Sequence, residues 1–195
     1  MFGIMGIGAG FMQAAGAHGE KIGKMELYSL MVDPEISSIT GTDIVVKTTK
    51  GGVAHEDTYA SLEGDTLSIS ADKNTKIFIT GTITECEIGE NADFVRISVK
   101  NTALTSLDCN DCYALQELNL SANTALTSLG CNDCVKIEII YYTAIDSDVA
   151  TAIAGAITAA DASDGTVYTD SAADYYSTIA DAATAKGWTI EQIQE

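Results

Sequence analysis

NTALTSLDCNDC at residues 101–112 returns 22 residues later as NTALTSLGCNDC at 123–134, with one change, from Asp108 to Gly130. A half-repeat lies between the two copies, and its Leu115, Leu118 and Leu120 keep the same apolar spacing. Weaker traces of this spacing extend to 83–88 and 94–99 before the copies and to 137–142 after them. A fixed period of this length predicts stacked structural repeats, because one repeat cannot bury its apolar face alone.

The apolar positions of each copy predict the core. The pattern Leu-x-x-Leu-x-Cys-x-x-Cys ends in alternating apolar residues, and alternate residues of a strand point to the same side. Stacking each strand on its equivalent one repeat later places identical residues in ladders inside the stack. The predicted ladder residues are Leu104, Leu107, Cys109, Cys112, Leu126, Leu129, Cys131 and Cys134.

In these residues the sequence resembles the leucine-rich-repeat family. The match is closest to the short repeats of Bacteroides-type bacteria and their phages, which are typified by LTSLDC and NTALTSL segments. The resemblance is strong over about residues 83–144, and GTVYT at 165–169 with ATAKGWTI at 183–190 is similar to the terminal cap of such arrays. It implies a recognition or scaffold role without catalysis, at an extracellular or particle surface. The chain departs from the family in having far fewer repeats than most such arrays.

The cysteines allow three interpretations. Cys109, Cys112, Cys131 and Cys134 form C-x2-C-x18-C-x2-C, which fits a zinc-site template. A disulfide between Cys112 and Cys134 is the second interpretation. We favour the third, buried thiol ladders, because the spacing follows from the repeat period and a free Cys packs as a small hydrophobic residue. The odd total of five, with Cys86, argues against a full disulfide framework. No cofactor is expected.

The amino-terminal stretch MFGIMGIGAGFMQAAGA at 1–17 is apolar and uncharged. It lacks the positive residues that open a secretory signal, so no cleavable signal peptide is evident. Glycines interrupt it too often for a membrane span. We predict that residues 1–24 form a docking arm for a partner or a second copy; covering one end of the chain's own core is the alternative. The expected contact residues are Phe2, Ile4, Met5, Ile7, Phe11 and Met12.

The charge balance excludes whole classes of partner. The 195 residues include 28 Asp plus Glu against 10 Lys plus Arg, for a formal net charge of −18. Such a chain is repelled by the phosphates of nucleic acid and by anionic membrane surfaces. Hydrophobic residues make up 46%, which is enough to bury a core.

No catalytic motif is recognisable in the sequence. G-x-S-x-G, H-E-x-x-H and P-loop patterns are absent, and neither His18 nor His55 has a nucleophile nearby in sequence. The Asp pairs at 146/148 and 161/164 fit helix caps and a solvated face better than a calcium loop. Of the adjacent tyrosines at 141/142 and 175/176, we expect one of each pair in the core and the other in a contact patch.

The segments before and after the repeats are predicted to cap them. Residues 25–82 form a β-rich amino-terminal region, expected as short runs at 27–32, 43–48, 58–62, 66–70 and 76–80. Residues 145–195 form a carboxy-terminal cap with a helix capped by Asp148, a strand at 165–169, and a second helix from an N-cap at Ser171 to a stop at Gly187. Trp188 is expected to plug the open end of the stack.

The sequence therefore predicts an α/β repeat protein: a short leucine-rich-repeat β-solenoid over 83–144 between a β-rich region and an α/β cap. We expect a non-enzymatic structural or interaction protein. The favoured setting is a phage virion, as a capsid decoration, head-fibre or tail-associated protein. A bacterial cell-surface adhesin or binding module is the alternative, and a zinc-stabilised CxxC domain is the third. Expected partners are copies of itself or capsid and tail proteins.

Overall fold

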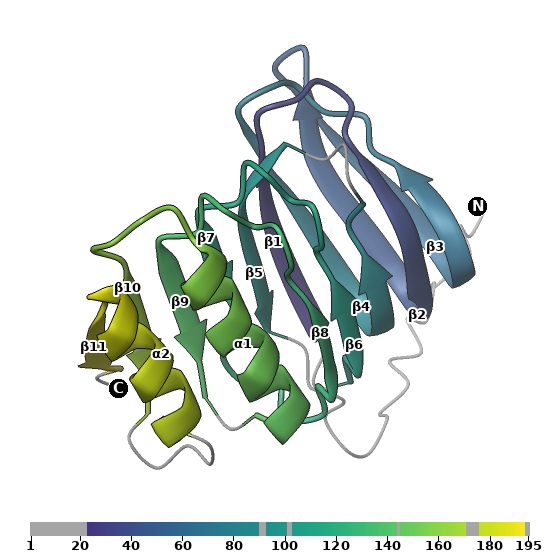
Figure 1. Cartoon of the computed structure of the whole chain (residues 1–195). Helices are drawn as coiled ribbons and strands as arrows, with labels where there is room; N and C mark the ends of the chain where they lie inside the picture. The colour runs from purple at the N-terminus through teal and green to yellow at the C-terminus, as the bar shows by residue number, and fades with distance from the viewer. Residues whose placement is uncertain (1–22, 90–92, 101–102, 144, 171–175, 194–195) are drawn as a thin grey trace, which may run out of the picture.

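The computed structural model describes residues 23–89, 93–100, 103–143, 145–170 and 176–193 (Figure 1). Within these ranges, 11 strands and two helices form a sheet-rich α/β protein, which confirms the α/β part of the predicted class. The leucine-rich-repeat solenoid stays a prediction, since the sheet is neither closed nor solenoid-like. The sheet is open, and its main path runs from β3 at one edge to β11 at the other. The predicted contact residues of the arm, at 2–12, lie outside the described residues.

The first part of the described chain is antiparallel. Its strands are β1 (Gly23–Ser29), β2 (Glu35–Lys50), β3 (Val53–Ser68) and β4 (Thr75–Glu87). The prediction of short runs is wrong for β2 and β3, which have 16 residues each. Gly41 and Gly64 both lie inside these strands. Gly51 and Gly52, with φ of 59° and 75°, form the turn between β2 and β3.

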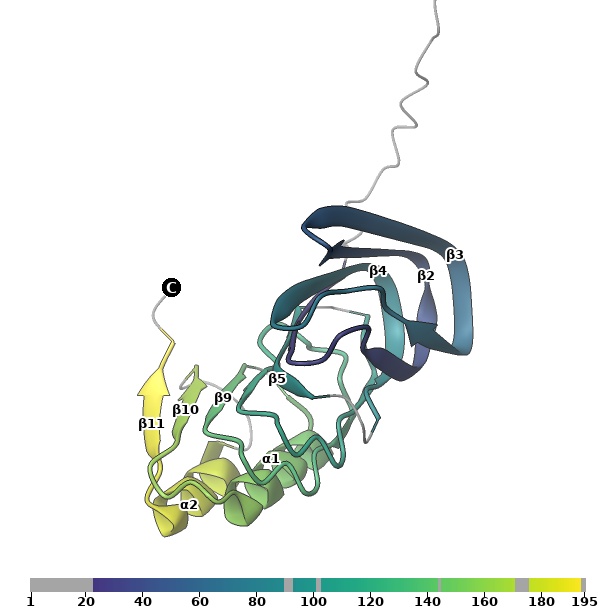
Figure 2. The ribbon, with the colours of Figure 1, turned by 90° about the horizontal axis from the view of Figure 1, so that it is seen from above.

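β2 and β4 change direction at glycines. Gly81 has a φ of 140°, and a Cβ there would lie 2.7 Å from the carbonyl oxygen of Asp43. A Cβ on Gly41 would lie 2.5 Å from the carbonyl oxygen of Thr82. Any larger residue therefore forces the backbone to move. Figure 2 shows the result: β2, β3 and β4 turn a corner, so that each strand contributes to two layers.

The first layer, which we call the long ladder, continues from the corner by antiparallel pairing as far as β5 and by parallel pairing beyond it. β4 pairs with β1, β1 pairs antiparallel with β5 (Phe94–Lys100), and parallel strands follow in the order β7 (Glu117–Asn119), β9 (Ile139–Tyr142), β10 (Thr166–Thr169) and β11 (Thr189–Gln192). One inward row runs across all of them. Its members are Ile77, Leu27, Ile97, Leu118, Ile140, Val167 and Ile190.

The second layer, the short ladder, is formed by the end of β4 with β6 (Ser106–Asp108) and β8 (Ser128–Gly130). β6 and β8 are the two copies of the repeat, and Leu107 lies opposite Leu129. The single difference between the copies also has a structural reason. A Cβ on Gly130 would lie 2.5 Å from Asp108 Oδ1, so the glycine leaves room for the side chain of the preceding copy.

The turns between the layers repeat their conformation as well. Asp111, Ala122 and Asp133, which are 11 residues apart, have φ of 59°, 65° and 58°. The backbone N–H of Asn132 donates to Asn110 Oδ1 at 2.8 Å, which joins one copy to the next. Equivalent residues thus hold equivalent places in successive turns.

Two helices complete the second layer beyond β8. α1 (Ser147–Ala159) contacts β8 and α2 (Tyr176–Lys186). The predicted cap at Asp148 is wrong: Asp146 caps α1, and its Oδ1 accepts a 2.8 Å bond from the N–H of Asp148. The predicted N-cap at Ser171 lies outside the described residues. Gly187 ends α2 with a φ of 85°.

The core lies between the two layers. Trp188 is only 5% exposed, packs against Gly165, and donates from Nε1 to the carbonyl of Ala162 at 2.9 Å.

At the edge of the sheet opposite β11, β3 is exposed along most of its length and carries four carboxylates, Glu56, Asp57, Glu63 and Asp65. Like charges on an edge strand discourage pairing with another edge of the same kind. Among the described residues, no helix is long and apolar enough to cross a membrane.

We predict that Gly81→Ala lowers the free energy of unfolding by about 1–3 kcal/mol, because a Cβ strains the backbone and meets a carbonyl oxygen at the corner. Urea denaturation followed by circular dichroism measures the change. Gly155→Ala is the matched control: it lies in α1 with open space around it and should raise stability by about 0.5–1 kcal/mol. Equal effects of the two substitutions would contradict the corner's role.

Candidate functional site

The predicted ladder residues are in the interior. Leu104, Leu107 and Leu126 are at most 1% exposed, and Leu129 is partly buried against the same core. The four cysteines of the two copies are also buried. These residues therefore hold the layers together and offer no surface to a ligand.

Hydrogen bonds hold the buried thiols between the turns. Cys109 Sγ donates to the carbonyl of Gly130 at 3.0 Å, and Cys134 Sγ donates to the carbonyl of Cys109 at 3.1 Å. All five cysteines, including Cys86, are free thiols. Within the described ranges, no group of three or more His, Cys, Asp or Glu residues is placed to hold a metal ion.

Burial suppresses the reactivity of most of these thiols. It raises the pKa of Cys86, Cys112 and Cys131 to about 12. The hydrogen bond between Cys109 and Cys134, with burial, raises the pKa of Cys109, and the same hydrogen bond lowers the pKa of Cys134. Since the thiolate is the reactive form and the metal ligand, Cys86, Cys109, Cys112 and Cys131 are chemically quiet at neutral pH in the folded chain.

The solvent-facing side of the long ladder, which we call the outer face, has no helix over it among the described residues. Figure 2 shows both helices on the opposite side of these strands. Two rows of paired residues cross the outer face. The first row is Lys76, Tyr28, Arg96, Glu117, Ile139, Thr166 and Thr189. The second is Phe78, Glu26, Ser98, Asn119, Tyr141, Tyr168 and Glu191.

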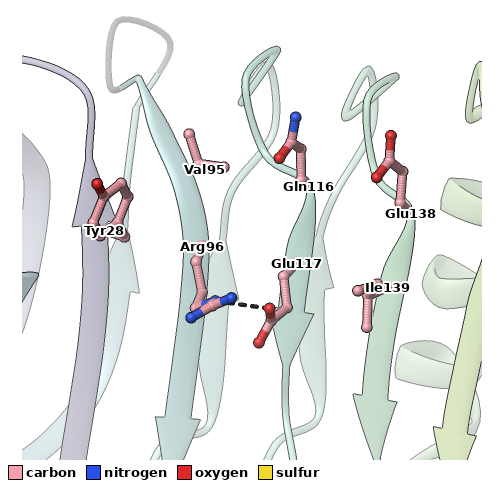
Figure 3. A pocket seen from close by; sticks show the side chains of 7 residues that line it. All are labelled: Tyr28, Val95, Arg96, Gln116, Glu117, Glu138 and Ile139. Atoms are coloured by element: carbon pink, nitrogen blue, oxygen red, sulfur yellow. Dashed lines mark ion pairs between the residues drawn. The ribbon is translucent and has the colours of Figure 1, made fainter. Parts of the chain in front are cut away.

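A shallow pocket of about 260 Å³ lies on the first row, where β1, β5, β7 and β9 meet (Figure 3). Its lining residues are Tyr28, Val95, Arg96, Gln116, Glu117, Glu138 and Ile139. Arg96 Nε lies 2.7 Å from Glu117 Oε2, which fixes both side chains across adjacent strands. The pocket thus combines an aromatic ring, an aliphatic side chain, an amide and fixed charges, which are groups that recognise a ligand or a protein surface.

Cations gather around Glu26 beside this pocket. Lys76 Nζ lies 2.7 Å and Lys24 Nζ 3.8 Å from the Glu26 carboxylate. Lys100 lines a neighbouring hollow with Lys24 and Glu26. The hydrogen bond from Lys76, together with the charges of Lys76, Lys24 and Arg96, outweighs burial and lowers the pKa of Glu26 below 4.5.

Aromatic rings mark the other half of the outer face. Tyr141 and Tyr168 stack with their ring centroids 4.6 Å apart and an angle of 11° between planes. Burial and the nearby charge of Glu117 raise the pKa of Tyr141. Of the adjacent pair 141/142, Tyr142 is buried and Tyr141 is on the outer face, as the sequence predicted for such pairs. Tyr176 is exposed, and Tyr175 lies outside the described residues.

Sequence reasoning did not identify the outer face. The available signal was the alternation in β1, where Lys24, Glu26 and Tyr28 alternate with the buried residues Met25 and Leu27. That alternation shows which residues point outward. It does not show that β1 sits between β4 and β5, which is what brings its side chains beside Lys76 and Arg96.

We predict that Lys76→Met raises the pKa of Glu26, because the shortest hydrogen bond to its carboxylate is lost. The lowered pKa stabilises the folded chain above pH 4.5, and this stability is lost as pH falls through the lower folded value. The stability difference between pH 7 and pH 3 should therefore shrink in Lys76→Met. NMR titration of the Glu26 carboxyl carbon measures the pKa, and Lys73→Met, in an exposed loop, should leave it unchanged.

We also predict that iodoacetamide modifies the folded chain slowly at pH 8 and modifies all five cysteines in urea, since burial keeps the thiols protonated and out of contact. Intact-mass spectrometry counts the adducts. The first adduct in the folded state should be at Cys134. A chelator provides the control for zinc: a metal-stabilised fold would melt earlier with chelator and then label rapidly.

Comparison with known proteins finds no matching family model, no similar curated protein and no similar solved structure. The function of this chain is therefore inferred from the side chains on its own surface.

Proposed function

We propose that this chain is a non-enzymatic structural or interaction protein, a short leucine-rich-repeat module displayed within a larger assembly, with a phage virion as the setting. The observation that carries the interaction role is the outer face: a regular, aromatic and charged surface with no helix over it. Tyr141 and Tyr168 are partly exposed on adjacent strands of this face, where aromatic rings can contact a partner.

The repeat module is supported by the spacing of equivalent residues. Leu107 pairs with Leu129 and Ser106 with Ser128, so the two copies lie in the register of the sequence repeat. Residues with a positive φ, Asp111, Ala122 and Asp133, recur at 11-residue intervals in equivalent turns. The antiparallel strands at one end and α1 and α2 at the other limit the stack, as capped repeat modules require.

The setting is supported by the sequence. The LTSLDC-type repeats resemble those of bacterial and phage leucine-rich-repeat proteins, and the apolar residues Phe2, Ile4 and Phe11 suit a segment that docks on an assembly. A strong negative charge keeps a multiply displayed protein from aggregating through its exposed surfaces. A capsid decoration, head-fibre or tail-associated protein meets these requirements.

The test is co-purification from the native source. Mass spectrometry of gradient-purified phage particles should find the chain with capsid and tail proteins at a fixed ratio. Recovery in the cell-envelope fraction instead would contradict the virion setting and identify the surface-adhesin alternative.

Incorporation of variant chains into phage particles tests the role of the amino-terminal arm. A variant lacking residues 1–20 should keep the circular dichroism spectrum and melting temperature of the parent but should fail to join particles. The matched variant Phe2→Ser, Ile4→Ser, Phe11→Ser keeps the length and should fail equally, because the contact is apolar. Normal incorporation of both variants would exclude the arm as the attachment point.

A further inference from the structure

The outer face is divided into halves of opposite charge. On β2, β4, β1 and β5 it carries Lys47, Lys76, Lys24, Arg96 and Lys100, which are five of the ten Lys and Arg residues in the chain. On β7, β9 and β11 the charged residues at its surface are carboxylates. These are Glu117, Glu138 and Glu191.

This division is unusual in a chain with a net charge of −18. Glu26 and Glu56 offset part of the cationic half through ion pairs with Lys76 and Lys47, at 2.7 and 3.0 Å. The outer face as a whole is therefore close to neutral, while the rest of the molecule is strongly acidic. Repulsion between two copies is weakest when these faces approach, since surface charges farther away are screened over about 8 Å at physiological salt.

The boundary between the halves lies near the centre of the face. β5 is the middle strand of the path from β3 to β11, and the Arg96–Glu117 pair joins β5 to β7. A two-fold axis at this position would bring the cationic half of one copy over the carboxylates of the other, and would do so twice. Such a surface is self-complementary, as two-fold interfaces require.

The size of the face is also suitable. The two rows of the outer face cross seven strands, so six strand spacings of ~4.8 Å give a width of about 29 Å, and strands of three to seven residues give a height of roughly 10–23 Å. The footprint of roughly 500 Å² per partner is at the small end of specific interfaces, which bury about 1,000 Å² or more in total. Its partly exposed tyrosines and its arginine are residue types that are enriched where interfaces gain most of their affinity.

We propose that the outer face binds the outer face of a second copy about this two-fold axis. The proposal rests on the interaction role above and specifies its partner. Arg96 and Glu117 lie near the axis, so each ion pair would meet its symmetry equivalent. Tyr141 and Tyr168 of one copy would pack over the aliphatic stems of the lysines on β1 and β4 of the other.

Paired charge reversals test this arrangement. Lys24→Glu with Lys100→Glu reverses the net charge of the cationic half, and Glu138→Lys with Glu191→Lys reverses the net charge of the carboxylate half. Sedimentation of the full chain in physiological salt should show a dimer. Each double variant alone should weaken dimerisation at least about tenfold, because like charges then face each other. An equimolar mixture of the two should form a heterodimer at least as tight as the parent dimer, since both contacts become attractive.

The control variants make the same types of charge reversal at positions away from the outer face. Lys73→Glu and Asp181→Lys lie in an exposed loop and on the exposed side of α2, and each should leave dimerisation unchanged. Circular dichroism confirms that every variant is folded. A parent chain that stays monomeric up to ~1 mM, or a mixture of the two double variants that stays monomeric, overturns the proposal. Co-purification with particles would then still decide the proposed function separately.

Discussion

The burial of one row of side chains between two layers is the interaction on which the rest of the structure depends. Ile77, Leu27, Ile97, Leu118 and Ile140 lie side by side on successive strands and are completely buried. Each contributes about 1.5–3 kcal/mol by leaving water. The strands are too short to pair stably alone, so the register of every strand is set by the need to place its apolar residue in this row. A slip of one residue would expose the row and bury charges of the outer face.

The same constraint creates the outer face. When Leu27 and Ile97 are held inward, the alternation of the strand places Glu26, Tyr28 and Arg96 outward. The parallel strands then align these side chains with Glu117 and Tyr141 from positions much later in the chain. The surface is thus a by-product of a rigid core, and its side chains keep fixed positions because the strands beneath them cannot move independently. The acidic charge elsewhere leaves this face as the one on which a second protein meets least repulsion.

The glycine corner explains how an antiparallel region can close one end of a parallel stack. Gly41 and Gly81 allow β2 and β4 to serve both layers, so the two layers begin as arms of the same strands. Two separate sheets would need separate caps. Here the corner also places β1 between β4 and β5, which joins the cations of β1, β4 and β5 into one cluster. At the other end, Trp188 is buried and α1 contacts both β8 and α2.

The sequence by itself determined the period, the inward leucines and cysteines, the helical cap and the acidic charge. Each of these follows from spacing or composition within a short segment. In a repeat, the strand that pairs with a given strand is its equivalent 22 residues away, so the sequence itself identifies the partner. The lengths of β2 and β3 and the residues of the outer face were decided by tertiary structure. Gly41 and Gly64 read locally as breaks, but pairing with neighbouring strands compensates for their flexibility. The meeting of Lys76, Glu26 and Arg96 depends on antiparallel pairing between segments about 20 to 70 residues apart, for which no local pattern carries the register.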